Sequence, residues 1–449
     1  MQRRVNMINK LIVRAIALAF LLPAAAQAND SDELEKLRGE LQDMKKTYES
    51  RIQSLESRLN QTETVANGAD KKADDVAVQA SSKPTSSNAF NPDISLILTG
   101  TLANRSQNSN YHITGFQAGG GIGPGSRGFS LGESELGMYA NIDDKFYGGL
   151  NLALAPDNTI GVEEAFIQTT SLPYGATVKA GRFFSSIGYL NEQHAHTWDF
   201  VDNPLAYQAF LGNQLGDDGV QLKWLAATDL FVELGAEYGR GRIADTAGRD
   251  KNGGNAGSVF AHVGGDVGIN NSWRAGLSYL SVSTENRQSN DLDATDAYVI
   301  NRFTGSSKIW IADAVWKWAP NGNASNTSVK LQGEYLHRNE DGSLNTDSYS
   351  ASQDGWYVQG VYKFLPYWRT GLRYDQLNSG SVNYGANTAN LVNTDYDPSR
   401  ISWMLDYNPS EFSRIRLQLS QDKSRIEATD NQVFIQYTMS LGAHGAHKY

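Results

Sequence analysis

The chain of 449 residues has no cysteine and only 11 prolines. Without cysteine, neither disulfides nor thiolate metal sites can hold the fold together. Beyond the N-terminus no stretch is apolar enough for a membrane helix, and the mean hydropathy is negative. A helical membrane protein is therefore excluded, and an exported fold with another source of stability, such as a closed barrel, is favoured.

Residues 1–28 have the layout of a secretory signal peptide. An apolar stretch, Leu11–Leu22, precedes a small-residue cleavage site at Ala26–Ala28. The basic residues of this segment are Arg3, Arg4, Lys10 and Arg14. The alternative is a true membrane anchor, but the apolar stretch is interrupted by Arg14 and ends at Pro23, short of the roughly 20 residues that a spanning helix needs.

Acidic residues outnumber basic ones, 49 to 39, which gives a formal charge of −10. Residues 1–28 hold four basic and no acidic residues, so the remaining chain would carry −14. Such a balance makes nucleic acid an unexpected partner.

After the signal segment, residues 29–62 show a narrow apolar stripe with spacings of three and four. Its members are Leu34, Leu37, Leu41, Met44, Tyr48, Ile52, Leu55 and Leu59. Charges of both signs surround the stripe, which favours an oligomerising coiled coil over a lone amphipathic helix lying on the barrel or membrane. Residues 63–90 are rich in Ala, Ser, Asp, Lys and Thr, have no sustained apolar period, and are predicted to form a flexible linker.

From residue 91 to the end the apolar pattern has period two, the pattern of strands with one apolar and one polar face. The last strand alternates Val433, Ile435 and Tyr437 with Phe434 and Gln436. Sixteen such segments are predicted, starting near residues 93, 128, 145, 160, 175, 218, 229, 257, 272, 307, 327, 355, 368, 399, 413 and 431.

The connections alternate between tight turns and longer loops, which is the signature of an outer-membrane barrel. The long connections are expected at 104–127, 184–217, 240–256, 284–305, 338–354 and 377–398. A soluble β-sandwich is the alternative, but charges on the second face of nearly every strand suit a water-filled lumen better. We therefore predict an all-β fold, a 16-stranded antiparallel transmembrane β-barrel over residues 91–449, preceded by a short N-terminal α-helical coiled coil. With an even number of strands both barrel ends lie on the short-turn side, so the N-terminal segment is expected in the periplasm.

Strand parity assigns charged residues to the lumen, where they would line a pore. The predicted pore-lining residues are Glu133, Glu135, Lys179, Lys223, Lys363, Arg373, Arg414 and Arg416. Acidic residues lead in the early strands and basic residues cluster late, an arrangement that could set a transverse field across the pore. For most individual positions the alternative, charge pairing between neighbouring strands, is the stronger reading.

The connection 184–217 is the longest, and in general porins the third external loop folds inward to form the constriction. His194 and His196 lie two residues apart, so an extended backbone would place both imidazoles on one side. With Glu192 and Asp199 they are candidate ligands for Zn²⁺ or another divalent ion. A solvated or hydrogen-bonded His-x-His pair is the alternative, and it is the more common one in polar loops.

Catalysis finds no support in the sequence, and we expect no enzyme activity. There is no cysteine nucleophile and no Gly-x-Ser-x-Gly motif. The glycines of 119–125 do not open a helix, as a phosphate-binding loop must.

Several short motifs carry a family resemblance. The segment Lys179–Phe183, the segment Gly355–Gly360 and Arg373-Tyr374-Asp375 resemble the phosphate-selective (polyphosphate-type) porin superfamily and its dicarboxylate-type relatives. The resemblance implies a homotrimer of 16-stranded channels, in some members with a periplasmic coiled coil. The acidic lumen predicted here departs from the ladder of arginines and lysines typical of phosphate channels. The stretches Asn191–Phe200 and Met439–Tyr449 are also similar to poorly characterised, zinc-associated outer-membrane proteins.

These patterns together predict a porin-like channel of a Gram-negative outer membrane for passive diffusion of small hydrophilic or charged solutes. Capture or uptake of zinc or another divalent metal is the alternative function, and no other cofactor is expected. The expected partners are outer-membrane lipid, the transported solutes and the barrel-assembly machinery, since the terminal Tyr449 resembles the aromatic signal that this machinery recognises. A TonB-dependent receptor is not expected, because such a protein needs a plug domain and 22 strands.

Overall fold

The computed structural model describes residues 92–107, 111–120, 122–242, 252–389, 391 and 393–442. The predicted signal peptide, coiled coil and linker lie outside these residues, and so does Tyr449. The described residues fall within one unit of the chain, Phe90–Tyr449. Among them, no helix has both the length and the apolar character needed to cross a membrane.

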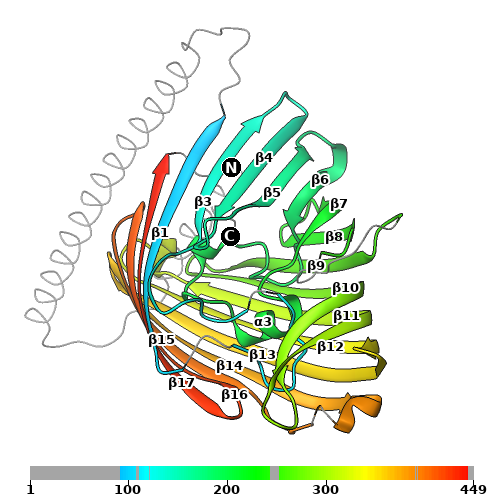
Figure 1. Cartoon of the computed structure of the whole chain (residues 1–449). Coiled ribbons are helices and arrows are strands. Elements are labelled where there is room, and N and C mark those ends of the chain that lie inside the picture. The colour runs from blue at the N-terminus through cyan, green and yellow to red at the C-terminus, as the bar shows by residue number, and fades with distance from the viewer. Residues whose placement is uncertain are drawn as a thin grey trace, which may run out of the picture. The chain divides into compact units, whose positions relative to one another are not determined.

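Antiparallel strands make up a single closed sheet (Figure 1). The strands are β1 (Asp93–Arg105), β2 (Gly128–Leu131), β3 (Ser134–Asn141), β4 (Phe146–Leu154), β5 (Ile160–Thr169), β6 (Ala176–Phe184), β7 (Gly216–Leu225), β8 (Phe231–Gly239), β9 (Ala256–Val267), β10 (Asn271–Leu292), β11 (Tyr298–Trp318), β12 (Ser328–Leu344), β13 (Asp347–Leu365), β14 (Trp368–Asn383), β15 (Ser399–Ser410), β16 (Ser413–Arg425) and β17 (Ala428–Gly442). Each strand pairs with its neighbours in sequence, and β1 closes the barrel by pairing with β17. Because β2 and β3 both pair with β1, they occupy one position in the barrel, so the predicted 16-stranded barrel is confirmed.

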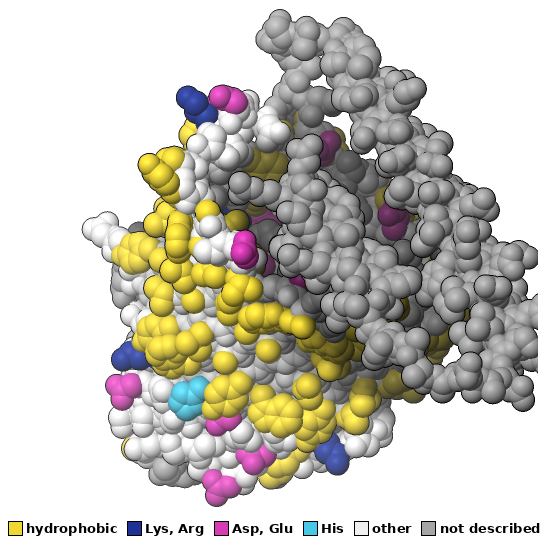
Figure 2. All heavy atoms as spheres, turned by 180° about the vertical axis from the view of Figure 1, so that it is seen from behind, with side chains coloured by type: hydrophobic (Ala, Val, Ile, Leu, Met, Phe, Trp, Pro, Cys, Tyr) yellow, Lys and Arg dark blue, Asp and Glu magenta, His cyan; other side chains and the backbone are white. Residues whose placement is uncertain are grey.

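The period-two pattern places apolar side chains on the outside of the barrel. In β17, Val433, Ile435 and Tyr437 are exposed, whereas Gln432 and Phe434 are buried toward the interior. Figure 2 shows the result as a band of hydrophobic side chains across the barrel wall, with charged side chains toward its edges. A barrel with such a belt is built to lie in a bilayer, where every backbone polar group must be paired within the sheet.

Two hairpins extend beyond the predicted strands, and here the expected loops 284–305 and 338–354 are wrong. β10 continues to Leu292 and β11 begins at Tyr298, and only two residues separate β12 from β13. Beyond the bilayer the outward residues need not be apolar, so the period-two signal fades while the strand pairing continues. Buried ion pairs inside this extension hold the hairpins together, with Arg287 2.6 Å from Glu340.

Two long connections fold into the barrel instead of standing above it. Residues 185–215, here called the inner loop, contain the helix α3 (Leu205–Leu211), whose seven residues are all buried. In Figure 1, α3 lies within the ring of strands. The connection after β1 joins it, with Phe116 packing edge-on against Phe210. The inward fold of the longest connection was predicted, while that of the connection after β1 was not.

The inner loop packs on the barrel interior through an apolar cluster. The cluster includes Tyr207 and Phe210 of the loop and Ile309, Ile311 and Leu336 of β11 and β12. Gly188 makes the close approach possible, since it has a φ of +66° and a Cβ there would lie 2.4 Å from Glu334. Barrel and loop thus share one core on this side of the lumen.

Candidate functional site

On one side of the lumen, the barrel presents a group of acidic side chains to the inner loop. This group, here called the acidic wall, consists of Glu135 of β3, Asn151 of β4, and Glu163 and Glu164 of β5. Neighbouring residues of a strand normally point to opposite faces. The strand pairing shifts between Asn151 and Leu152, so that β5 has an extra residue here. This bulge lets both Glu163 and Glu164 reach the same site.

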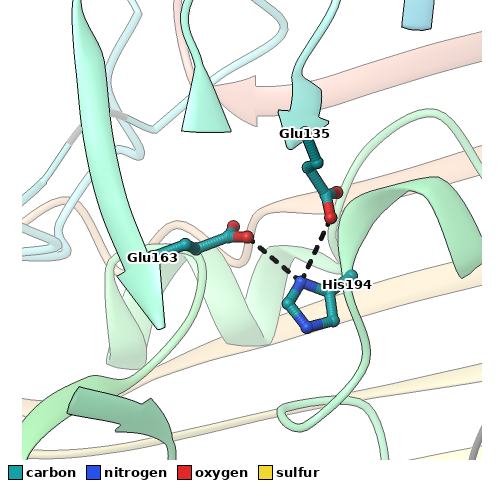
Figure 3. Close-up of side chains that lie close together, drawn as sticks. All are labelled: Glu135, Glu163 and His194. Carbon is teal, nitrogen blue, oxygen red and sulfur yellow. Dashed lines mark hydrogen bonds and ion pairs between the residues drawn. The ribbon is translucent and has the colours of Figure 1, made fainter. Parts of the chain in front are cut away.

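The two loop histidines bind the acidic wall, and Figure 3 shows His194 with Glu135 and Glu163. His194 Nδ1 lies 3.1 Å from Glu163 Oε2 and 3.4 Å from Glu135 Oε2, and its Nε2 lies 3.1 Å from Glu164 Oε2. His196 Nδ1 lies 2.9 Å from the other oxygen of Glu135. The two rings are stacked 5.8 Å apart, so both imidazoles lie on one side, although Ala195–Thr197 forms a 3-10 helix and not the extended backbone on which the prediction rested.

The carboxylates determine the charge of His194. Burial lowers its pKa, but hydrogen bonds to Glu163 and Glu164 and the charge of Glu135 have the larger, opposite effect, so the pKa of His194 is well above its ordinary value. A protonated imidazole can donate from both nitrogens at once. As an imidazolium, His194 therefore ties the inner loop to two strand positions.

Strands β14 to β16 carry a second group of lumen-facing side chains, which are arginines and mostly buried. This arginine wall consists of Arg369 and Arg373 of β14, Arg400 of β15 and Arg416 of β16. The ion pairs of the wall run to loop residues and to neighbouring strands: Arg373–Asp202 at 2.9 Å, Arg400–Asp202 at 2.6 Å, Arg369–Asp199 at 2.9 Å, Arg369–Asp406 at 2.8 Å and Arg416–Asp406 at 2.8 Å. Two loop aspartates thus meet three guanidinium groups.

These cations lower the pKa values of the two loop aspartates, Asp199 and Asp202. Burial raises the pKa of Asp199, but Lys330 and Arg369 outweigh it, and the net pKa is below the ordinary value. Burial also raises the pKa of Asp202, but Arg400 and Arg373 have the larger, opposite effect, so its net pKa is lowered as well. Both carboxylates are therefore ionised at neutral pH.

The four residues predicted to bind a metal do not lie together in the structure. Glu192 forms an ion pair with Lys223 at 2.8 Å, and Asp199 belongs to the arginine wall. His194 and His196 instead lie with strand carboxylates. The sequence reasoning missed Glu163 and Asn151 as members of this site. The adjacent pair Glu163-Glu164, which breaks the alternation of its strand, was the available signal.

The predicted pore-lining residues fall into three groups. Glu135, Lys179, Lys363 and Arg414 line an open cavity. Lys223 pairs with Glu192, and Glu133 lies at the junction of β2 and β3. Arg373 and Arg416 do not line open space, because they are 2% and 0% exposed beneath the inner loop. Parity gave their direction correctly, but it could not show that a loop covers them.

The cavity lies inside the barrel between the inner loop and the short turns, and it has a volume of about 1210 Å³. Basic residues from seven strands line it: Lys179, Arg274, Lys317, Lys330, Lys363, Arg369 and Arg414. Lys317 lies directly opposite Lys330, and Lys363 directly opposite Arg369. Like charges directly opposite one another destabilise a sheet, and here the ion pairs of Lys330 and Arg369 with Asp199 offset the repulsion. Acidic residues line the cavity as well: Glu135 and Glu164 of the acidic wall, Glu192, Asp199, Asp266 and Glu411.

Comparison with known proteins places the chain in a family. No protein-family profile matches it. An uncharacterized protein of Aquifex aeolicus (strain VF5) is 34% identical over 401 residues, which cover 82% of this chain and 81% of that protein. The chain belongs to the family of this Aquifex protein. The similarity spans most of both chains, so the two proteins are related over their main part and not through a single motif.

The barrel of the present chain resembles several solved structures. The outer-membrane channel DcaP of Acinetobacter baumannii superposes with a TM-score of 0.50 over 78% of this chain and 97% of DcaP, at 10% identity. OprB of Pseudomonas putida reaches a TM-score of 0.49 over 78% of this chain and 94% of its own, at 14% identity. At such low identity the likeness to DcaP concerns the fold alone, a porin-type β-barrel.

Proposed function

We propose that this protein is an outer-membrane channel for the passive diffusion of small, hydrophilic, charged solutes. The observation that carries the proposal is the charged cavity inside a closed 16-stranded barrel, bounded by an inward-folded loop. In this proposal the inner loop is the constriction that decides what passes.

The charge distribution supports a preference for anions. Most basic residues of the cavity come from strands β10 to β14 and β16, whereas Glu135 and Glu164 of the acidic wall come from β3 and β5. All three glutamates of the acidic wall are paired with His194. In this proposal the side of the cavity formed by β10 to β14 and β16 attracts anionic solutes and raises their local concentration. This agrees with the resemblance to phosphate-selective and dicarboxylate-type porins.

The barrel ends support a membrane orientation. Ser95 near the start of β1 pairs with Gly442 at the end of β17, and Ser440 donates a backbone hydrogen bond to Phe412 in a short turn. Both barrel ends therefore lie on the rim of the short turns, which faces the periplasm in outer-membrane barrels. Within the proposal the N-terminal segment is periplasmic, and the assembly is a homotrimer held in part by the coiled coil.

Planar-bilayer recording tests the proposal. Purified full-length protein should give stepwise conductance, and in a salt gradient the reversal potential should have the sign of an anion-preferring pore. Substituting Lys363 by Glu should shift the reversal potential toward cations, while Asp218→Asn, at an exposed ion pair with Arg182, serves as the matched control. The absence of conductance across a range of salts and voltages would refute a channel function.

A further inference from the structure

Four polar groups of the acidic wall and the inner loop converge on one point. Asn151 Nδ2 lies 3.0 Å from Glu135 Oε2, 3.0 Å from Glu163 Oε2 and 3.1 Å from His194 Nδ1. His194 Nδ1 is in turn 3.1 Å from the same oxygen of Glu163 and 3.4 Å from that of Glu135. Five separations among four atoms thus lie between 3.0 and 3.4 Å.

This spacing is close to that of a tetrahedral metal site. Ligands about 2.0–2.1 Å from Zn²⁺ at tetrahedral corners lie about 3.3–3.4 Å from each other. The carboxylate oxygens and the imidazole nitrogen, from Glu135, Glu163 and His194, all lie within 4.8 Å of one another. A small inward or outward shift of each group would therefore complete the coordination sphere.

The Asn151 side chain gives a second, independent indication. It is 2% exposed, and its Oδ1 is buried with no hydrogen-bond partner. Turning the amide by 180° exchanges its oxygen and nitrogen and brings Oδ1 to the point where the other three groups meet. Without a cation, that oxygen would face two carboxylates. With a cation it becomes the fourth ligand, and its unmet acceptor capacity is satisfied.

The groups around these ligands are those that a metal site needs. His194 Nε2 lies 3.1 Å from Glu164 Oε2, which would fix the tautomer and leave Nδ1 free for a metal. The second oxygen of Glu135 is held by His196 Nδ1 at 2.9 Å. Such supporting hydrogen bonds orient ligands and typically change metal affinity by about 10–100-fold.

We propose that Glu135, Glu163 and His194, with the amide oxygen of Asn151, bind a divalent transition-metal ion of the Zn²⁺ class. One nitrogen and three oxygens suit Zn²⁺, whereas Ca²⁺ and Mg²⁺ prefer all-oxygen sites with more ligands. The ion would connect β3, β4 and β5 to the inner loop. The ligand set differs from the one that the sequence predicted, since it replaces Glu192, Asp199 and His196 by strand residues. The proposal does not depend on whether the barrel conducts.

Calorimetric titration of the chelator-treated full-length protein with ZnCl₂ tests this site. His194→Ala and Glu163→Gln should each weaken the binding of Zn²⁺ at least about ten-fold. The matched control is His337→Ala on β12, a half-buried histidine away from the cluster that contacts Asn339. Zn²⁺ affinity within two-fold of the wild type in both cluster variants would overturn the proposal.

The variant Asn151→Asp guards against a result caused by poor folding. An aspartate offers an oxygen in either rotamer and should tighten Zn²⁺ binding, and Zn²⁺ should raise the unfolding temperature of this variant more than that of the wild type. If the cluster is only a hydrogen-bonded network, the added carboxylate repels its neighbours and Zn²⁺ has no stabilising effect. That outcome would also contradict the proposal.

Discussion

The acidic wall and the arginine wall hold the same inner loop at two different places around the barrel, but by different chemistry. On the acidic wall, loop imidazoles meet strand carboxylates, with His194 between Glu163 and Glu164. On the arginine wall, loop aspartates meet guanidinium groups, with Asp202 between Arg373 and Arg400. Arginine keeps its charge at any physiological pH, whereas an imidazole can lose its proton or exchange it for a metal. The arginine wall is thus a permanent attachment, and the acidic wall one that can respond to conditions.

The largest effect is expected from breaking the arginine wall. Asp202→Asn removes the loop carboxylate that two buried guanidinium groups share, and uncompensated buried charge should lower the free energy of unfolding by about 3 kcal/mol. Thermal unfolding followed by circular dichroism measures this. The control, Asp218→Asn at the more exposed pair with Arg182, should cost about 1 kcal/mol or less. Equal losses in both variants would show that the arginine wall is not a special attachment.

A smaller effect is expected on the acidic wall. Glu164→Gln keeps the shape of the side chain but removes one charged partner of His194, and should cost about 1–2 kcal/mol. The fluorescence of Trp198, which lies in the inner loop, should change more in this variant than the global unfolding temperature does. A global loss as large as that of Asp202→Asn would remove the distinction between the two walls.

The smallest effect is expected from mild acid. The pKa values of Asp199 and Asp202 are lowered in the folded protein, so their stabilisation is present above the unfolded pKa of about 4 and is lost only as the pH falls through the lower folded values. The pKa of His194 is raised, so its contribution is complete below about 6.5. Protease sensitivity of the inner loop should therefore stay constant from pH 7 to 5. Loosening within that range would mean that the loop depends more on another carboxyl, such as Glu334, which accepts hydrogen bonds from Tyr189 and Leu190, than on the two walls.

The sequence was sufficient to predict the barrel because a bilayer imposes a period of two on every strand that crosses it. Outside the bilayer this constraint ends, so the extensions of β10 to β13 gave no signal. The alternation of residues along a strand predicted which charged side chains face the lumen, as for Arg373. Arg369 lies four residues earlier on the same strand, so the same rule could have found it. Partner choice could not be predicted, because the bulge that turns Glu163 inward and the fold of the inner loop are set by tertiary packing.

The central claim is that the inner loop, held between the two walls, is the constriction of the channel. Single-channel conductance of the wild type, compared with a variant in which residues 189–212 are replaced by a short Gly-Ser linker, tests this most directly. Both proteins should insert as folded barrels, and the shortened variant should conduct several times more current with weaker ion selectivity. Equal conductance and selectivity in the two proteins would contradict the claim.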